Sequence, residues 1–163
     1  MGQGRAEGEA AEGGARVRLR PLSAAEHRAA WRRWLRDPEV AEWMGGRVPH
    51  APVTLGIERA SDGALIGGAA LVDVSEDGRA ELVIAIGQAD ARGRGYGREA
   101  VRQAVAYARA SLGVQEVYLR VRADNRRAIR CYLASGFVRE GRMVRRTPGK
   151  AARAVFLMTH RTG

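Results

Sequence analysis

The chain has 163 residues, a length that suits one domain with a single core, and its 45% hydrophobic content excludes disorder of the whole chain. No apolar run approaches the roughly 20 residues that a membrane-spanning helix needs. The single cysteine, Cys131, excludes an internal disulfide, so we expect a cytoplasmic protein. The net charge of +10 is almost all arginine, since Lys150 is the only lysine. Such charge suits a nucleic-acid surface, a polyanionic small ligand or a coding habit without function, and composition leaves all three open.

Residues 1–15 are rich in Gly, Ala and Glu and are predicted to form a flexible leader before a single domain at residues 16–163. Residues 16–22 alternate between apolar side chains and Arg, which is typical of a half-buried strand. Ser23 and Glu26 have the spacing of a capping box, so a helix is predicted from Ala24 to about Leu35. A second short helix through Val40 and Trp43 should end at the Gly45-Gly46 pair.

The middle of the chain reads as three strands, at residues 54–59, 65–74 and 79–87. The turn sequences Ser-Asp-Gly and Glu-Asp-Gly separate them and favour hairpins, so these strands should form an antiparallel meander. The pair Gly67-Gly68 inside the second strand indicates a weakened strand, a bulge or a close backbone approach.

The last third begins with a glycine-rich turn at residues 91–97, followed by a helix with an apolar stripe that ends near Gly113. Alternation at residues 117–121 predicts a strand. Asp124 can cap a further helix over residues 125–135. Two final strands are predicted near residues 137–144 and 153–160.

The glycine-rich turn is the most informative segment. Gly93, Gly95 and Gly97 would expose successive backbone N–H groups at the start of a helix, where the donors are unpaired and the helix dipole is positive, so a pyrophosphate would fit. Arg92, Arg94 and Arg98 concentrate positive charge there. A P-loop needs a Gly-Lys-Ser/Thr that is missing, and the dinucleotide fingerprint needs two residues between its last two glycines, where this turn has one. A merely flexible glycine-rich loop is the alternative.

Two motifs carry a resemblance to a known family. The turn Arg92–Gly97 matches the Arg/Gln-x-x-Gly-x-Gly/Ala signature of GNAT acetyltransferases, and Asn125–Phe137 resembles their Asn-x-x-Ala-x-x-x-Tyr-x-x-x-Gly-Phe helix. The motifs lie about 30 residues apart in the expected order, and the resemblance covers roughly Arg16–His160. The Gly-Tyr-Gly-Arg-Glu-Ala form of the turn is similar to ribosomal-protein N-terminal acetyltransferases and to their aminoglycoside-acetylating relatives.

This resemblance implies an α+β fold of three layers, in which a mixed, mostly antiparallel sheet of about six to seven strands is flanked by about four helices. It implies acetyl-CoA as co-substrate, with its pyrophosphate in the turn and its pantetheine arm along a central strand that splays from its neighbour. The Ile86 N–H would stabilise the developing oxyanion, a contribution of about 3 kcal/mol when water is excluded. The residues that the resemblance assigns to acetyl-CoA are Ile84, Ala85, Ile86, Arg92, Gly93, Arg94, Gly95, Tyr96, Gly97, Arg98, Asn125 and Arg130.

The same resemblance implies direct attack of a primary amine on the thioester within a ternary complex. Tyr132 is the candidate general acid for the leaving thiolate, and Asn125, two helical turns before it, would lie on the same helix face. A packed amphipathic aromatic is the alternative role for Tyr132. Glu81 is the candidate general base, acting through water, although it could equally be a solvated strand residue.

The acceptor is less well determined. Only residues 45–53 are available for a wall of the acceptor groove, and such an open site favours a peptide or protein N-terminus, with an aminoglycoside or polyamine as the alternative. Few acids could hold a polycation there, Asp37, Glu39 and Glu42 being the exceptions. A non-catalytic CoA-binding sensor or an RNA-binding module competes from outside the class, although sparse aromatic residues disfavour nucleic acid. The three histidines lack metal-ligand spacing, so no metal is expected, and a homodimer is left open.

Overall fold

The computed structural model describes residues 14–161, so the predicted leader lies, up to residue 13, outside the described part of the chain. One sheet of seven strands has the order β1-β2-β3-β4-β5-β7-β6. Neighbouring strands are antiparallel except for β4 and β5, which are parallel. The meander expected in the middle of the chain is confirmed as β2-β3-β4. The strands are β1 Val17–Pro21, β2 Val53–Arg59, β3 Leu65–Val74, β4 Arg79–Ile86, β5 Glu116–Arg122, β6 Val138–Arg145 and β7 Arg153–Arg161.

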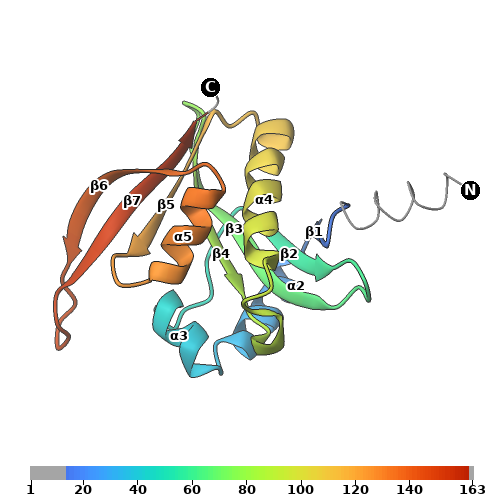
Figure 1. Cartoon of the computed structure of the whole chain (residues 1–163), viewed down its shortest axis with the longest axis horizontal. Helices are drawn as coiled ribbons and strands as arrows, with labels where there is room; N and C mark the ends of the chain where they lie inside the picture. The colour runs from blue at the N-terminus through green and yellow to red at the C-terminus, as the bar shows by residue number, and fades with distance from the viewer. Residues whose placement is uncertain (1–13, 162–163) are drawn as a thin grey trace, which may run out of the picture.

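Helices cover both faces of the sheet (Figure 1). The helices α4 and α5 lie on one face and α2 and α3 on the other, which confirms the three-layer α+β fold. Their bounds are α2 Ala24–Trp34, α3 Pro38–Met44, α4 Tyr96–Leu112 and α5 Arg126–Ala134, with a short 3-10 turn η1 at Ala89–Ala91. No helix between residues 14 and 161 is long and apolar enough to cross a membrane.

Each face has its own core. On one face, the apolar stripe of α4, which includes Val101 and Val105, packs on buried strand residues such as Leu82 and Leu119. On the other face, Trp31 and Trp34 of α2 pack with Val40 of α3 against Ala85 of β4. Burial of such side chains stabilises the fold by about 1.5–3 kcal/mol each, so both helical layers are held chiefly by apolar contact.

The Gly67-Gly68 pair marks a close approach of α2 to the sheet. A Cβ atom on Gly68 would lie 2.8 Å from Nε1 of Trp31, so only glycine lets the helix pack at this depth. The alternative of a bulge is also borne out beside this pair, because the register with β2 shifts next to Gly67: Gly67 lies opposite Ile57, whereas Glu58 lies opposite Leu65. A second irregularity lies between Leu71 and Asp73 in the pairing with β4.

Two helix starts differ in how well the sequence predicted them. Ser23 and Glu26 form the expected capping box, with hydrogen bonds of 3.1 and 3.3 Å. At α5, however, the predicted cap is wrong: the Asn125 side chain caps the helix by accepting from the N–H of Ala128, 3.3 Å away. Asp124 does not cap the helix because its carboxylate pairs with Arg122 at 2.8 Å.

The central strands β4 and β5 separate like the arms of a V. They pair through Arg79–Glu116, Ala80–Val117 and Glu81–Tyr118, and the described residues add no pair beyond these. From residue 82 onward, the edge of β4 that faces β5 therefore has no strand partner. Backbone N–H and C=O groups need hydrogen-bond partners when water is excluded, so this open edge can receive an extended ligand.

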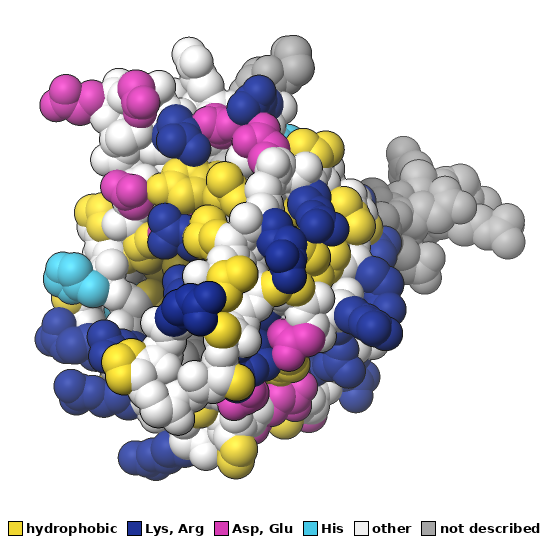
Figure 2. All heavy atoms as spheres, turned by 90° about the vertical axis from the view of Figure 1, so that its left-hand side faces the viewer, with side chains coloured by type: hydrophobic (Ala, Val, Ile, Leu, Met, Phe, Trp, Pro, Cys, Tyr) yellow, Lys and Arg dark blue, Asp and Glu magenta, His cyan; other side chains and the backbone are white. Residues whose placement is uncertain are grey.

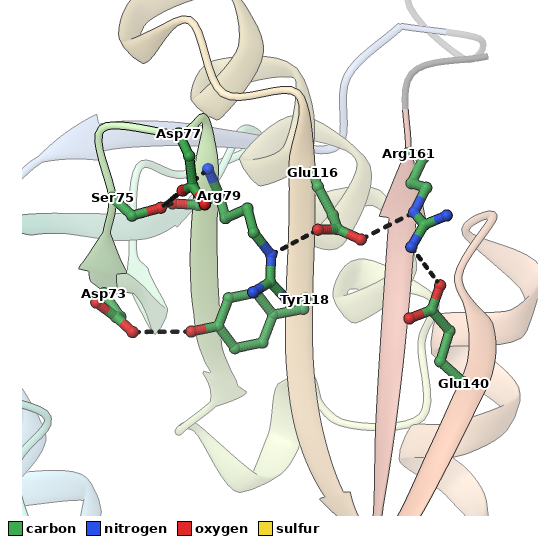
Figure 3. Close-up of polar contacts among 8 residues, drawn as sticks. All are labelled: Asp73, Ser75, Asp77, Arg79, Glu116, Tyr118, Glu140 and Arg161. Atoms are coloured by element: carbon green, nitrogen blue, oxygen red, sulfur yellow. Dashed lines mark hydrogen bonds and ion pairs between the residues drawn. The ribbon is translucent and has the colours of Figure 1, made fainter.

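Polar side chains brace the closed end of this V (Figure 3). Glu116 of β5 accepts from Arg79 of β4 at 2.6 Å and from Arg161 of β7 at 2.8 Å, and Arg161 also pairs with Glu140 of β6 at 2.9 Å. The hydrogen bond from Arg161, assisted by Arg79, lowers the pKa of Glu116. Four strands are thus tied together at the end remote from the opening.

Candidate functional site

A large cavity occupies the open end of the V. Its volume is about 1850 Å³, and it is lined by β4, the turn before α4, the first turns of α4 and α5, helix α3 and the hairpin between β6 and β7. The lining thus includes residues from both sides of the sheet, from α4 and α5 on one side and from α3 on the other. Figure 1 shows these helices on their two sides of the sheet. Most of the residues that the sequence assigned to the site line the cavity.

The glycine-rich turn presents unpaired donors to this cavity. Gly93 and Gly95 have φ values of 72° and 85°, a left-handed conformation that favours glycine, and Gly95 is the N-cap of α4 without a side-chain cap. Among the described residues, no acceptor is found for the backbone N–H groups of residues 93–98. Such a row of donors at the start of a 17-residue helix fits an anion of the size of a diphosphate.

The arginines of the turn have different surroundings. Arg92 is engaged with protein acceptors and lies between β4 and α3 rather than over the open N–H groups. Arg94 donates to the Asp90 carbonyl at 2.7 Å. Arg98 and Arg130 are exposed, line the cavity and, within residues 14–161, form no hydrogen bond or ion pair, so their guanidinium groups can serve a ligand.

The open edge of β4 continues from the turn into the cavity. Ile84, Ala85 and Ile86 line it, and they lie beyond the last pair that β4 forms with β5. On the other side of the strand, each is paired with β3, opposite Ala69, Gly68 and Gly67 respectively. The strand is thus held rigidly from one side while its other edge is available to a ligand.

Helix α5 places two predicted residues on the cavity wall. Asn125 lines the cavity while capping the helix, and Tyr132 lines it two turns later. The Tyr132 ring packs against Phe137 at 5.9 Å between centroids, and its hydroxyl has no partner among the described side chains and main chain. Burial, with a smaller effect of the neighbouring Cys131 thiol, raises the pKa of Tyr132 well above that of a free phenol. The hydroxyl therefore keeps its proton until an acceptor arrives.

Glu81 lies on β4 where the V begins to open, and it also lines the cavity. Its carboxylate is 3.4 Å from the Arg120 guanidinium, and 13% of its side chain is exposed. Burial raises the pKa of Glu81, and the nearby Asp73 adds to this, while Arg120 and Arg145 act in the opposite direction. A carboxyl group whose pKa is raised in this way is suited to accepting a proton near neutral pH.

In the part of the cavity on the α3 face, Glu39 and Glu42 lie where the sequence analysis expected acids of the acceptor groove, but the basic side chains there were missed. Here Trp43 of α3 stacks on the Arg122 guanidinium, with 4.5 Å from Cζ to the ring centroid, whereas Trp31 and Trp34 belong to the core. The basic side chains that line this part are Arg120 and Arg122 on β5, Arg145 on β6, Lys150 in the hairpin and Arg153 on β7. The alternation of Arg120 and Arg122 with buried Leu119 and Val121 was a signal that both arginines share one sheet face.

Two further titratable side chains border the cavity, Cys131 and Glu99. Cys131 lies next to Tyr132 on α5, and burial raises the pKa of its thiol. The backbone N–H of Arg16 donates to Glu99 at 2.7 Å, which ties β1 to α4. In the part of the chain that the structure describes, no three His, Cys, Asp or Glu side chains are placed as a metal would require.

Comparisons with known proteins agree with this geometry. The chain matches the family model described as acetyltransferase (GNAT) domain over residues 16–138. It is similar in structure to the spermidine N-acetyltransferase of Vibrio cholerae, solved with CoA and spermine, with a TM-score of 0.75, 21% identity, and 90% of this chain and 95% of that chain covered. It is also similar to the aminoglycoside acetyltransferase AAC(6')-Ib, solved with coenzyme A and kanamycin, with a TM-score of 0.73, 21% identity, and 89% and 94% of the two chains covered. The chain therefore belongs to the GNAT acetyltransferases and is an acetyl-CoA-dependent N-acetyltransferase.

Proposed function

We propose that this enzyme transfers the acetyl group of acetyl-CoA to the primary amine of a small molecule. One observation carries the proposal: the unpaired N–H groups of residues 93–98, the open edge of β4, Glu81 and the Tyr132 hydroxyl all border a single cavity. The two similar proteins are, by their names, a spermidine and an aminoglycoside acetyltransferase. These names support a small-molecule acceptor more than the peptide N-terminus that the short segment 45–53 favoured. The resemblance to the ribosomal-protein branch stays a prediction.

The binding roles follow the shape of the cavity. The N–H groups of residues 93–98 hold the diphosphate of acetyl-CoA, and Arg98 and Arg130 supply positive charge to its phosphates. The main chain of residues 84–86 hydrogen-bonds the pantetheine arm along the open edge of β4, and Asn125 braces the arm from α5. Acetyl-CoA, when bound, supplies an acetyl thioester to the mouth of the V.

The chemical roles belong to three groups. Glu81 takes a proton from the acceptor ammonium, directly or through water, so that a neutral amine nitrogen forms the new N–C bond. The Ile86 N–H donates to the thioester carbonyl oxygen as negative charge develops there. The Tyr132 hydroxyl gives its proton to the sulfur as the C–S bond breaks. The nitrogen of the adduct loses its second proton, which returns through water to the Tyr132 phenolate, so the products are a neutral N-acetyl amine and the free CoA thiol.

An acetylation screen tests the proposal. Polyamines, aminoglycosides, single-amine metabolite analogues and peptides are incubated with acetyl-CoA, and thiol release is followed together with the mass of the product. We expect turnover on at least one small primary amine, with a product 42 Da heavier, a gain calculated from one acetyl group replacing one hydrogen. Turnover confined to peptides would reverse the choice of acceptor, and acetyl-CoA binding without turnover on any amine would identify a sensor.

A further inference from the structure

The acceptor end of the cavity is the part between α3, β5 and the β6–β7 hairpin, and one face of the sheet lines it. In the strand register, Arg122 lies opposite Val155, Val155 lies opposite Met143, and Arg145 lies opposite Arg153. Paired residues share a face and faces alternate along a strand, so Arg120, Arg122, Arg145 and Arg153 all project to the side that carries α3. Lys150 in the connecting hairpin also lines this end. Figure 2, which faces the β6 end of the molecule, shows Lys and Arg side chains gathered over its lower left.

The acids at this end are already paired with these cations. Glu42 lies 2.8 Å from Arg122 and 3.7 Å from Arg153, and the hydrogen bond from Arg122 lowers the pKa of Glu42. Asp124 lies 2.8 Å from Arg122, and Glu81 lies 3.4 Å from Arg120. Glu39 of α3 also lines the cavity, and it lies 2.9 Å from Arg92. With this pair included, four carboxylates face six cations, and each of the four already has an arginine partner.

Two of the cations have no such partner. Within residues 14–161, neither Arg145 nor Lys150 forms an ion pair or a side-chain hydrogen bond. Arg145 also lies directly opposite Arg153 in the antiparallel ladder, where like charges are destabilising. An anion between these guanidinium groups would relieve that repulsion, because arginine binds carboxylate and phosphate groups through paired N–H donors.

We infer that the acceptor amine carries an anionic group, a carboxylate or a phosphate, which binds to Arg145, Arg153 and Lys150 while the amine points to Glu81. The inference rests on the proposed function and narrows its acceptor to a class. It separates this enzyme from acetyltransferases of polycations, because a second ammonium group at this end would meet unpaired Arg145 and Lys150 instead of a free carboxylate.

Matched amines test the charge preference. The kcat/KM values of 4-aminobutyrate and phosphoethanolamine are compared with those of their uncharged counterparts, 4-aminobutanamide and ethanolamine, and with that of putrescine, which carries a second ammonium group. We expect the anionic member of at least one pair to be preferred by about tenfold or more, as one charge-assisted hydrogen bond would provide. The two pairs distinguish a carboxylate site from a phosphate site. Equal values within both pairs, or a preference for putrescine, would overturn the inference.

Variants locate the preference. Arg145→Gln and Arg153→Gln should each reduce the ratio of anionic to neutral kcat/KM by about tenfold. Arg142→Gln is the matched control: Arg142 is exposed on the same strand but lies outside the cavity lining, so the ratio should not change. An unchanged ratio in both cavity variants would contradict the assignment.

Binding separates this inference from the proposed function. Calorimetric titration of the CoA complex with 4-aminobutyrate and phosphoethanolamine reports the charge preference even if no amine is acetylated. Binding of an anionic amine that Arg145→Gln weakens would support the anion site although the catalytic proposal had failed. Acetylation of neutral and cationic amines with no anionic preference would keep the function and exclude the anion site.

Discussion

The guanidinium of Arg92 makes four hydrogen bonds: to the carbonyl groups of Ile86 and Gly87 and to the carboxylates of Asp37 and Glu39. It therefore joins the end of β4 to the start of α3 and fixes the glycine turn relative to the acceptor side. The hydrogen bond from Arg92, together with the N–H of Glu39, lowers the pKa of Asp37, so this carboxylate stays charged at neutral pH. The phosphate contact expected of the Arg92 side chain stays a prediction, and the contacts that the structure shows for it brace β4 against α3.

Tyr132→Phe tests the general acid. Removing the hydroxyl should lower kcat by about a hundredfold, the lower end of what a positioned proton donor contributes, while the Kd for acetyl-CoA changes little. Steady-state kinetics and calorimetry give the two values. Tyr107→Phe is the control, because Tyr107 packs against the core away from the cavity lining. An undiminished kcat in Tyr132→Phe would leave Tyr132 with a packing role only.

The pH profile tests Glu81. Because the pKa of Glu81 is raised, its carboxylate, the form that accepts a proton, becomes populated only as the pH rises above the usual carboxyl range. We therefore expect kcat/KM to rise with pH through this pKa, below the pH at which the free amine titrates. Glu81→Gln should remove the rise of kcat/KM at low pH and leave the rise at higher pH that is due to deprotonation of the free amine. Glu76→Gln, in an exposed turn, should retain both rises. If the rise of kcat/KM at low pH persists in Glu81→Gln, a group other than Glu81 causes it.

At the scale of elements, the anion site that we propose at α4 depends on how this helix begins. The chain reaches it through two glycines with positive φ, and its N-cap residue has no side chain that could occupy the first N–H groups. A Ser or Asp at this position would ordinarily accept from those donors and stabilise the helix. The donors therefore remain available to a ligand.

Gly97→Asp separates ligand binding at this element from its stability. A carboxylate in the first helical turn interacts favourably with the helix dipole, and a Cβ at Gly97 would meet Ile86 and Cys131 only at 3.8 and 3.9 Å, so the fold should tolerate the change. The same charge repels the diphosphate, and we expect the Kd for acetyl-CoA to rise by about tenfold or more, a loss of about 1.4 kcal/mol. Gly97→Asn controls for size. Equal affinity in Gly97→Asp and wild type would move the diphosphate elsewhere.

Elements with local signals could be predicted from the sequence. The capping box at Ser23 and the left-handed Gly113 act through neighbouring residues, so the ends of α2 and α4 followed from the sequence. The cap of α5 could not be decided in the same way, because Asp124 and Asn125 are both good caps. The choice depends on Arg122, which holds Asp124 by an ion pair.

At the scale of the molecule, acetyl-CoA should stabilise the whole fold. A ligand that binds only the native state adds about 2.7 kcal/mol at a hundred times its Kd. For a domain of this size, this corresponds to a rise in Tm of roughly 5–10 °C. Thermal denaturation with and without acetyl-CoA gives the shift, and Gly97→Asp should show a smaller one at the same concentration. An unchanged Tm at saturating acetyl-CoA would contradict a site inside the native cavity.

The residues that line the proposed cofactor half of the cavity could be predicted from the sequence, and most of those that line the acceptor half could not. The turn and the α5 helix are contiguous motifs whose spacing is visible in the chain, and both line the cavity. The acceptor end combines α3 with β5 and the β6–β7 hairpin; Glu42 and Arg122, for example, are 80 residues apart. Such contacts depend on the strand order β5-β7-β6, which no local pattern reveals.

The V between β4 and β5 has a mechanical consequence. The sheet consists of two halves, β1–β4 and β5–β7–β6. The residue pairs that join β4 to β5 are confined to one end, where Glu116 pairs with Arg79 and Arg161. A pantetheine arm lying along β4 would form hydrogen bonds with the open edge at the other end. The bound substrate would then take the place of a neighbouring strand, so the hydrogen bonds of this edge would form on binding and break on product release in every turnover.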